Sequence, residues 1–147
     1  MRLVVQRVKK AEVTVVSSGK VAGSIEKGLF VLVGVKKGDT KKEAEILANK
    51  IVKLRVMADE AGKMNLSVVD TKSKILAVSQ FTLYADTKGG NRPSFIQAED
   101  PEKAVEIYNH FVAKIKELGV ETEIGSFGSE MKIDTELDGP VTIIFET

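Results

Sequence analysis

The order of strand and helix patterns along the chain is the feature that most restricts its fold. Short β-branched or apolar segments, typical of strands, come in runs, and two amphipathic helical patterns interrupt them. A regular alternation of strands and helices would instead favour a doubly wound parallel sheet. At 147 residues the chain also has a common size for one domain. We therefore expect a single α+β domain over residues 1–147, with a curved, barrel-like mixed or antiparallel β-sheet and two main helices.

The two helices are predicted from capping residues that are followed by apolar residues at helical spacing. Thr40 and Glu43 match a capping box, in which each side chain bonds the backbone of the other residue. In the second helix Asp100 is the expected N-cap, Pro101 takes the first helical position, and Gly119 ends the helix. The apolar stripes, which need a sheet to pack on, are Ala44, Leu47, Ala48, Ile51 and Leu54, and then Ala104, Val105, Tyr108, Phe111, Val112, Ile115 and Leu118.

Strands are predicted before, between and after these helices. The expected segments are 3–8, 12–16, 21–25, 29–35, 54–58, 66–69, 75–84, 120–124, 131–137 and 141–146. The polar turn at residues 17–20 predicts an antiparallel hairpin, and the apolar run 29–35 predicts a strand covered on both faces. Pro140 precedes the last run, which is typical of a buried strand. The first residue of a strand tolerates the missing N–H of proline.

The side-chain inventory excludes several kinds of chemistry. There is no cysteine, and the single histidine, His110, lies on the polar face of the second predicted helix, where we expect a surface position. These counts exclude thiol nucleophiles, Ser-His-Asp catalysis and zinc or iron–sulfur clusters. No phosphate-binding glycine motif is present, so we expect neither a metal nor a nucleotide cofactor. Any catalysis must then use backbone groups, hydroxyls or functional groups of the substrate.

The overall composition is that of an ordinary soluble protein. Hydrophobic residues make up 43% and charged residues 29%, and no apolar run is long enough to cross a bilayer. The start, MRLVVQRVKK, has too short an apolar stretch for a signal peptide and predicts a first strand. The lack of cysteine fits a reducing compartment, so we expect a cytoplasmic location. The net charge of +1 gives no general attraction to nucleic acid. The short lysine pairs Lys9-Lys10, Lys36-Lys37 and Lys41-Lys42 are either solvated surface or a local phosphate-facing patch.

Polar residues interrupt the apolar segment ILAVSQFTLY at Ser79, Gln80 and Thr82. As a strand, this segment would place Ser79 and Phe81 on one face and Gln80 and Thr82 on the other. These polar groups either form hydrogen bonds within the core or line a pocket. In the second case Gln80 orients a polar ligand, and Thr82 supplies its hydroxyl or its backbone N–H.

Five short motifs, taken together and in order, resemble those of the D-aminoacyl-tRNA deacylases. They are QRV near the start, GKMN, SQFTLY, GGNRPSF and the terminal GPVT, and the likeness covers the whole chain. The resemblance implies a homodimer with a β-barrel-like fold and an active site at the subunit interface. It also implies hydrolysis of the ester that joins a D-amino acid to the terminal adenosine of tRNA, and of glycine mischarged on alanine tRNA.

The same resemblance implies roles for particular residues. The implied catalytic residues are Ser79, Gln80, Phe81 and Thr82, and the implied substrate-binding residues are Arg7, Phe127, Met131, Gly139 and Pro140. Gly139 and Pro140 would be joined by a cis peptide bond and would reach into the pocket of the other subunit, with Arg7 holding them in place. Phe127 and Met131 would pack near the adenine. No metal is implied.

The implied mechanism is physically coherent. Carbonyl oxygens beside Gly139 would accept from the ammonium group of the ligand, so that an L side chain would collide with the backbone while glycine would pass. The 2′-OH of the terminal ribose would help to activate water, and N–H groups near Phe81 and Thr82 would stabilise the oxyanion. The chain departs from the family at Leu137, where an asparagine is usual. Asp138 is a local substitute for its turn-forming hydrogen bonds.

Two other functions fit the same residues. In a non-catalytic RNA-binding module, SQFTLY would belong to the core and the Gly-Pro step would only end a strand. In a generic ester hydrolase, Thr82 would be a covalent nucleophile, although no base that could activate it is visible in the sequence. Such a hydrolase would also act on esters that lack a 2′-OH.

Overall fold

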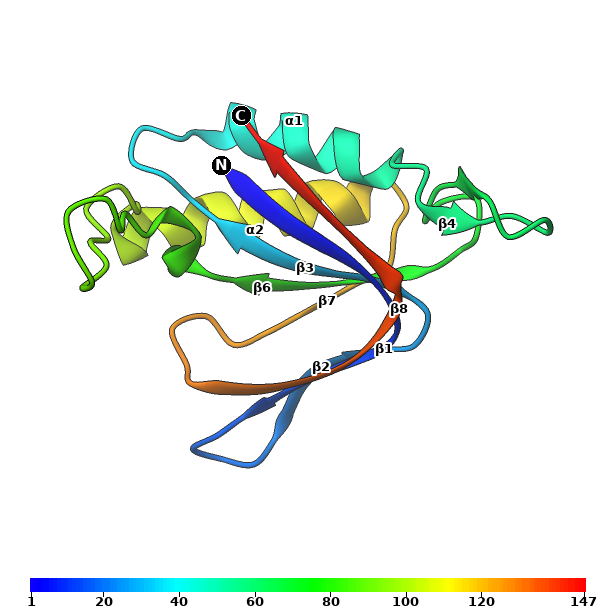
Figure 1. Cartoon of the computed structure of the whole chain (residues 1–147), viewed down its shortest axis with the longest axis horizontal. Helices are drawn as coiled ribbons and strands as arrows, with labels where there is room; N and C mark the ends of the chain where they lie inside the picture. Colours follow the sequence, from blue (N-terminus) through cyan, green and yellow to red (C-terminus); the bar gives the residue numbers. More distant parts are fainter.

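A strongly curved sheet with two helices on one face makes up the molecule (Figure 1). The computed structural model describes every residue from Met1 to Thr147. In chain order the elements are β1 (Arg2–Val15), β2 (Val21–Ile25), β3 (Gly28–Gly34), α1 (Lys41–Val52), β4 (Met57–Ala58), β5 (Met64–Leu66), β6 (Lys74–Ser79), a 3-10 helix (Phe81–Tyr84), α2 (Pro101–Glu117), β7 (Thr122–Ile124) and β8 (Met131–Glu146). The expected α+β class, with a barrel-like mixed sheet and two main helices, is confirmed.

The long strand β1 organises the sheet because its two halves pair with different neighbours. The first half pairs with β3 and the second with β2, while β8 runs along its other side, all antiparallel. β6 and β7 continue the sheet in parallel, in the order β2-β1-β3-β6-β7. A side-chain carbon built on Gly23 of β2 would lie 2.6 Å from the carbonyl oxygen of Ile124 in β7. The glycine therefore lets the two edges approach, and the sheet nearly closes.

Apolar clusters fill both sides of the curved sheet. The larger cluster, of 25 buried residues, lies between the sheet and the two helices and includes Leu29, Leu47 and Phe111. The smaller cluster, of 7 buried residues, lies inside the curve and includes Phe30 and Val78. Alternate residues of β3 enter the two clusters, which confirms the prediction of a strand covered on both faces. No helix is long and apolar enough to span a membrane.

Both helices begin at the predicted residues, but their caps differ. Thr40 and Glu43 form the expected capping box: the Thr40 hydroxyl accepts from the Lys42 amide at 3.2 Å, and the Glu43 carboxylate accepts from the Thr40 amide at 2.7 Å. Asp100 occupies the N-cap of α2, yet its side chain makes no capping hydrogen bond. Pro101 sets the first helical position, and this suffices to start the helix because proline has its φ fixed near the helical value.

The prediction of one strand over residues 75–84 is wrong beyond Ser79. The last ladder bond is donated by the Gln80 amide to the Val33 carbonyl at 2.8 Å. Past this point β3 has ended and β7 pairs only as far as Ala77 of β6, so no neighbouring strand is left to bond. The chain satisfies its backbone locally instead, in the 3-10 helix Phe81–Tyr84. The alternation of side-chain faces expected for SQFTLY therefore does not apply.

The strands predicted over 131–137 and 141–146 form a single edge strand, β8, just as the segments 3–8 and 12–16 form the single strand β1. In the pairing of β8 with β1, Leu137 lies opposite Val8 and Thr142 opposite Gln6. Residues 138–141 bulge out opposite Arg7 alone. Pro140 therefore lies in a bulge and not at the start of a strand, and the bulge removes the need for its missing N–H.

The prediction that residues 141–146 are buried is also wrong. Ile144 is 65% exposed, and within this run only Phe145 is buried. The reason is topological: β8 pairs with β1 on one side and with no strand on the other. A β-branched run predicts a strand, but the strand's place in the sheet decides how far it is covered.

Candidate active site

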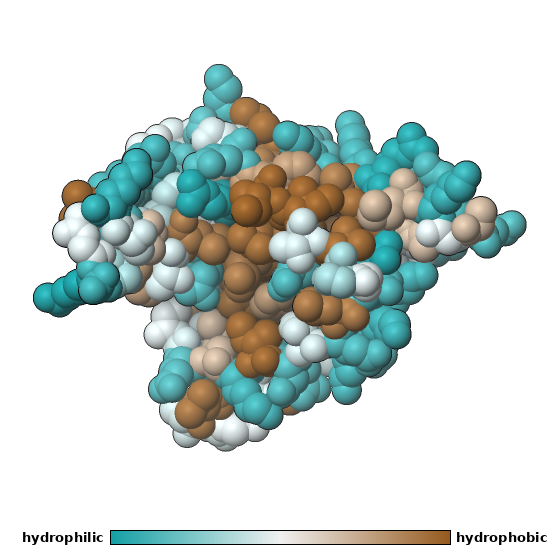
Figure 2. All heavy atoms as spheres, viewed as in Figure 1, coloured by the Kyte–Doolittle hydropathy of each residue, from teal (hydrophilic) through white to brown (hydrophobic).

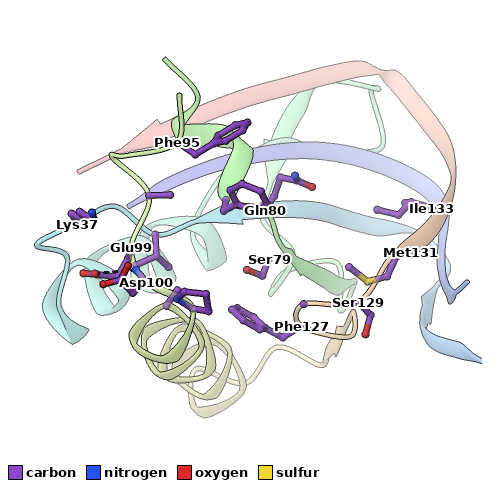
Figure 3. A pocket seen from close by; sticks show the side chains of 16 residues that line it. Lys37, Ser79, Gln80, Phe95, Glu99, Asp100, Phe127, Ser129, Met131 and Ile133 are labelled. Atoms are coloured by element: carbon purple, nitrogen blue, oxygen red, sulfur yellow. Dashed lines mark hydrogen bonds between the residues drawn. The ribbon is translucent and has the colours of Figure 1, made fainter. Parts of the chain in front are cut away.

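A cavity of about 560 Å³ opens where the end of β6, the 3-10 helix, the start of α2 and the start of β8 converge (Figure 3). Its walls mix apolar side chains with a few polar groups, as is usual for small-molecule sites. It is lined by Val35, Lys37, Ser79, Gln80, Phe81, Phe95, Ala98, Glu99, Asp100, Pro101, Ala104, Phe127, Gly128, Ser129, Met131 and Ile133. The segment between β7 and β8 contributes Phe127, Gly128 and Ser129, and the start of β8 contributes Met131 and Ile133.

The SQFTL segment forms one wall of the cavity. Ser79 ends β6, Gln80 leaves the ladder, and Phe81 opens the 3-10 helix; all three line the cavity. Thr82 does not line it, but its hydroxyl accepts a hydrogen bond from the Gln80 side-chain amide at 2.6 Å. The amides of Phe81 and Thr82 belong to the first turn of the 3-10 helix, where N–H groups have no partner within the helix. They are available to a ligand.

Phe127 and Met131 lie across the cavity from Gln80 (Figure 3). The Phe127 ring packs against the buried Tyr108 ring, with centroids 6.1 Å apart, and this contact ties it to α2. The Met131 sulfur accepts from the Ser126 amide at 3.3 Å. A side-chain carbon on Gly125 would lie 3.0 Å from the same sulfur, so glycine lets Met131 sit close to the sheet. This wall is apolar and suits a flat, uncharged group.

Charged groups gather at one end of the cavity, where Lys37, Glu99 and Asp100 lie (Figure 3). The Glu99 side chain is 7% exposed and accepts from the Lys103 ammonium at 2.8 Å, and from the amides of Asp100 at 3.1 Å and Gly38 at 3.3 Å. The hydrogen bond from Lys103, helped by those of the two amides, holds the pKa of the Glu99 carboxyl below its usual range. Glu99 is thus an ionised, fully engaged acceptor and a poor proton donor.

Arg7, Gly139 and Pro140 lie outside this cavity. The buried Arg7 donates through Nε to the Asp138 carbonyl at 3.2 Å and pairs with the Asp138 carboxylate at 2.9 Å. It also donates through a terminal nitrogen to the Val56 carbonyl at 2.7 Å. Arg7 therefore fixes the bulge of β8 through Asp138, the residue next to Gly139. The Gly139–Pro140 peptide bond is cis, and both residues are exposed.

Backbone and packing both select glycine at position 139. Its φ of +130° is rare for residues with side chains, and a side-chain carbon would lie 2.9 Å from the Val141 nitrogen and 2.8 Å from the Val141 Cγ2. Leu137, where the family usually has asparagine, is 43% exposed and lies opposite Val8 in the ladder. The Asp138 carboxylate and carbonyl both bond the Arg7 side chain, and the expected side-chain-to-backbone turn of Asp138 is not formed.

Of the predicted site residues, the structure brings together Ser79, Gln80, Phe81, Phe127 and Met131 in one cavity, but not Thr82, Arg7, Gly139 or Pro140. Sequence reasoning missed Lys37, Phe95 and Glu99. The GGNRPSF motif contains Phe95 and was a usable signal. Lys37 stood out only as one of three lysine pairs, and Glu99 carries no local signal, because the two residues meet only in the fold. His110 lies away from the cavity, on the surface as expected, with its ring nitrogen 2.9 Å from a Glu45 carboxylate oxygen.

The fold and the cavity define a class of protein: a small, nearly closed β-barrel domain with two covering helices, whose pocket offers backbone amides, hydroxyls and apolar walls. A family model described as D-Tyr-tRNA(Tyr) deacylase matches residues 4–146. The chain belongs to this family, so the resemblance noted in the five motifs is confirmed.

Curated relatives agree with this assignment, and two solved structures share the fold. The chain is 55% identical over 147 residues to a D-aminoacyl-tRNA deacylase of Aquifex aeolicus, with 100% of this chain and 98% of that protein covered. It is 53% identical over 148 residues to one of Thermosipho melanesiensis, with 100% and 97% covered. A solved structure named c-Myc DNA Unwinding Element Binding Protein is 41% identical, with a TM-score of 0.93 and coverage of 100% and 99%. A probable eukaryotic D-amino acid tRNA deacylase, 15% identical with a TM-score of 0.82 and coverage of 98% and 97%, shares the fold.

Proposed function

We propose that this protein hydrolyses the ester bond of D-aminoacyl-tRNA to free amino acid and tRNA, as a chiral proofreading step in translation in the cytoplasm. The observation that carries the proposal is the single cavity in which Ser79, Gln80 and Phe81 face Phe127 and Met131. Its apolar wall suits the terminal adenine, and its opposite wall offers amides and hydroxyls to an ester. Membership of the D-Tyr-tRNA(Tyr) deacylase family supports aminoacyl-tRNA as the class of substrate for this cavity.

Catalysis in this proposal relies on the backbone and on the substrate. Water, oriented by the 2′-OH of the terminal ribose, adds to the ester carbonyl carbon, and the amides of Phe81 and Thr82 hold the resulting oxyanion. The ester C–O bond then breaks, and the proton from water passes to the departing 3′ oxygen. Two observations support this route: the cavity contains no histidine or cysteine, and the nearby carboxylate of Glu99 is already engaged by three donors.

The rival route, in which Thr82 is a covalent nucleophile, has less support. The Thr82 hydroxyl accepts from the Gln80 amide, which is a donor and cannot act as a base. We expect Thr82→Ala to keep kcat for D-tyrosyl-tRNA within about tenfold of the wild type, because the backbone amides remain. A loss of about a thousandfold or more, or an acyl-enzyme trapped on the wild type, would favour the nucleophile.

Chiral selection is proposed to come from a second copy of the chain. In one chain Gly139 and Pro140 are exposed and outside the cavity, so this proposed role requires a homodimer that brings them to the partner's site. Figure 2 shows hydrophobic side chains gathered over the face on which β1 and β8 lie, and the exposed Ile144 and Leu137 belong to β8. Carbonyl oxygens of the Gly-Pro bulge would accept from the ammonium group, and an L side chain would meet the Gly139 backbone. Glycine would pass, so glycine on alanine tRNA is a second proposed substrate.

The test is hydrolysis of D-tyrosyl-tRNA and L-tyrosyl-tRNA by the purified protein. We expect turnover of the D-ester and at least a hundredfold slower turnover of the L-ester, which is about 2.7 kcal/mol of discrimination. Glycyl-tRNA(Ala) should be hydrolysed as well. Equal rates on the two tyrosyl esters would contradict chiral selection, and binding of tRNA without any hydrolysis would support a non-catalytic RNA-binding module instead.

A further inference from the structure

We propose that the rings of Phe81 and Phe95 form a stacking surface for the unpaired nucleotides that precede the terminal adenosine of the tRNA. Arg92 and three lysines near the rings, Lys36, Lys37 and Lys88, would contact the phosphates of the same nucleotides. This inference rests on the proposed function, because it assigns a binding surface to the next part of the same substrate.

Two large aromatic rings are left in solvent at the rim of the cavity. Phe81 is 56% exposed and Phe95 is 38% exposed, and both line the cavity. Their centroids lie 5.0 Å apart with ring planes at 72°, an edge-to-face arrangement that leaves ring faces free. Any nucleobase can stack on such a face, because stacking does not depend on the hydrogen-bonding edge of the base.

The place of these rings fits the path of the nucleic acid. Phe95 and Phe127 lie on opposite sides of Ser79 and Gln80 (Figure 3). If the terminal adenine packs on Phe127 and its ester lies at Ser79 and Gln80, the rest of the acceptor end must leave through the open rim. Phe81 and Phe95 are the exposed rings at that rim.

The loop that carries Phe95 is held in place by backbone hydrogen bonds. Asp86 and Ser94 exchange a pair of N–H···O bonds, both 2.8 Å long. The Lys37 amide donates to the Gln97 carbonyl at 2.9 Å, and the Ala98 amide donates to the Phe95 carbonyl at 3.0 Å. Because the ring is positioned before binding, little ordering of this loop is needed when a base stacks on it.

Cations without ion-pair partners lie on the loop that carries Phe95 and on the segment bonded to that loop. Lys36, Lys37, Lys88 and Arg92 are exposed and take part in none of the ion pairs of the structure. They lie on the two chain segments that the hydrogen bond between Lys37 and Gln97 joins. The nearby Glu99 carboxylate is engaged by Lys103 and does not neutralise them. Two further carboxylates lie on these segments: Asp86, which accepts from the Lys88 amide at 2.9 Å, and Asp100 at the cavity. Neither forms an ion pair with the four cations, so their charged groups are left to contact the phosphates of a polyanion such as RNA.

The test compares two D-tyrosyl esters that share the reacting end, D-tyrosyl-tRNA and 3′-D-tyrosyl-adenosine. Phe95→Leu keeps an apolar side chain but removes the ring face. We expect the ratio of kcat/KM for the tRNA ester to kcat/KM for the adenosine ester to fall about tenfold in this variant. Phe95→Tyr, which keeps the ring, should restore the ratio. Ile96→Ala is the matched control, because Ile96 is a 73% exposed aliphatic side chain of the same loop.

An unchanged ratio in Phe95→Leu would overturn the proposal, whether or not total activity falls. It would mean that Phe95 supports the cavity or contacts the amino acid, since both esters would then be affected alike. If the wild type hydrolyses neither ester, the proposed function fails and this inference fails with it. If the Phe95→Leu protein is a monomer and its ratio of kcat/KM values is unchanged, then the ring contributes to contacts between subunits and not to RNA binding.

A second measurement does not depend on the aromatic pair. The slope of log K against log salt for binding of uncharged tRNA should become less steep by roughly 1.4 in the double variant Lys88→Gln, Arg92→Gln, because each lost phosphate contact on a single strand removes about 0.7. The control is Lys53→Gln with Lys116→Gln, two exposed lysines at the far ends of the helices (Figure 1). Equal slopes for the double variant and the wild type would contradict the phosphate contacts.

Discussion

At the scale of single residues, two separate reasons exclude a side chain at Gly139. Its φ of +130° disfavours any residue with a side chain, and the first atom of that side chain would press on the Val141 amide. Arg7 prevents the bulge from relaxing away, because its guanidinium is buried and bonded to Asp138 and to the Val56 carbonyl at once. The bulge is therefore rigid while its tip is exposed.

Gly139→Ala should shift this bulge and lower activity. We expect kcat/KM for D-tyrosyl-tRNA to fall at least tenfold, because the alanine carbon would lie 2.9 Å from the Val141 nitrogen and must displace the backbone that meets the ligand. Gly19→Ala is the matched control: its φ is +65°, and nothing lies within 4 Å of the added carbon. That variant should lose some stability and keep its activity. Full D-ester turnover in Gly139→Ala would refute chiral selection by this backbone.

Removal of the hydroxyl group from each of two buried tyrosines should change the free energy of unfolding in different directions. Tyr108 donates its hydroxyl to the Ala77 carbonyl at 2.9 Å, whereas the Tyr84 hydroxyl is buried without a partner. We expect Tyr108→Phe to lower the free energy of unfolding by about 1 kcal/mol, and Tyr84→Phe to leave it unchanged or raise it by up to about 1 kcal/mol. Urea denaturation measures both values. Equal destabilisation by the two substitutions would show that Tyr84 has a hydrogen-bond partner in solution.

At the scale of elements, local sequence signals predict the helices, because helix starts and apolar stripes depend on residues close together in the chain. The caps at Thr40 and Pro101 and the apolar stripes that follow them were sufficient to place both helices, since capping and periodicity involve residues within a few turns. The end of β6 was not predictable in this way. Phe81 to Tyr84 have side chains typical of a strand, but β3 and β7 have already ended beside them, and only the assembled sheet determines this.

The same distinction between local signals and the assembled fold applies to the candidate site residues. The resemblance of SQFTLY and of the segment around Phe127 and Met131 to a known family placed five residues that meet in the cavity. Physical reasoning from the sequence alone left open whether Ser79 and Gln80 line a pocket or belong to the core. Glu99 and Lys37 could not be found, because they reach the cavity through the backbone pairing of residues 36–37 with 97–98, some sixty positions apart in the chain.

The two helix starts allow a matched test of capping. Thr40 accepts from the first turn of α1 and also donates to Glu43, whereas the Asp100 side chain makes no capping bond. Thr40→Ala should therefore lower the free energy of unfolding by about 1 kcal/mol, and Asp100→Ala by clearly less. Thermal or urea unfolding distinguishes them. A larger loss in Asp100→Ala would mean that this carboxylate stabilises α2 through its charge, independently of a hydrogen bond.

At the scale of the whole molecule, the cavity and the Gly-Pro bulge lie apart within one chain. The cavity lies between the end of β6 and the start of α2, whereas the Gly-Pro bulge projects from the edge strand β8 and lines no part of it. The same edge strand carries exposed apolar side chains and has a pairing partner on one side only. An open edge of this kind is a surface that natural proteins cover, and a second copy would cover it while bringing the bulge to a cavity.

Ile144→Lys tests this arrangement, because it places a charge on the outer face of β8 where the side chain is 65% exposed. In the isolated chain such a change costs little stability, but in a dimer it would bury an unpaired charge. We expect a monomer by analytical ultracentrifugation, an unchanged circular dichroism spectrum, and at least a hundredfold loss of D-tyrosyl-tRNA hydrolysis. Ile46→Lys, on the outer side of α1 and 46% exposed, is the matched control and should stay dimeric and active. An active Ile144→Lys monomer would place the complete site within one chain and would leave the exposed Gly139–Pro140 bulge without a role in catalysis.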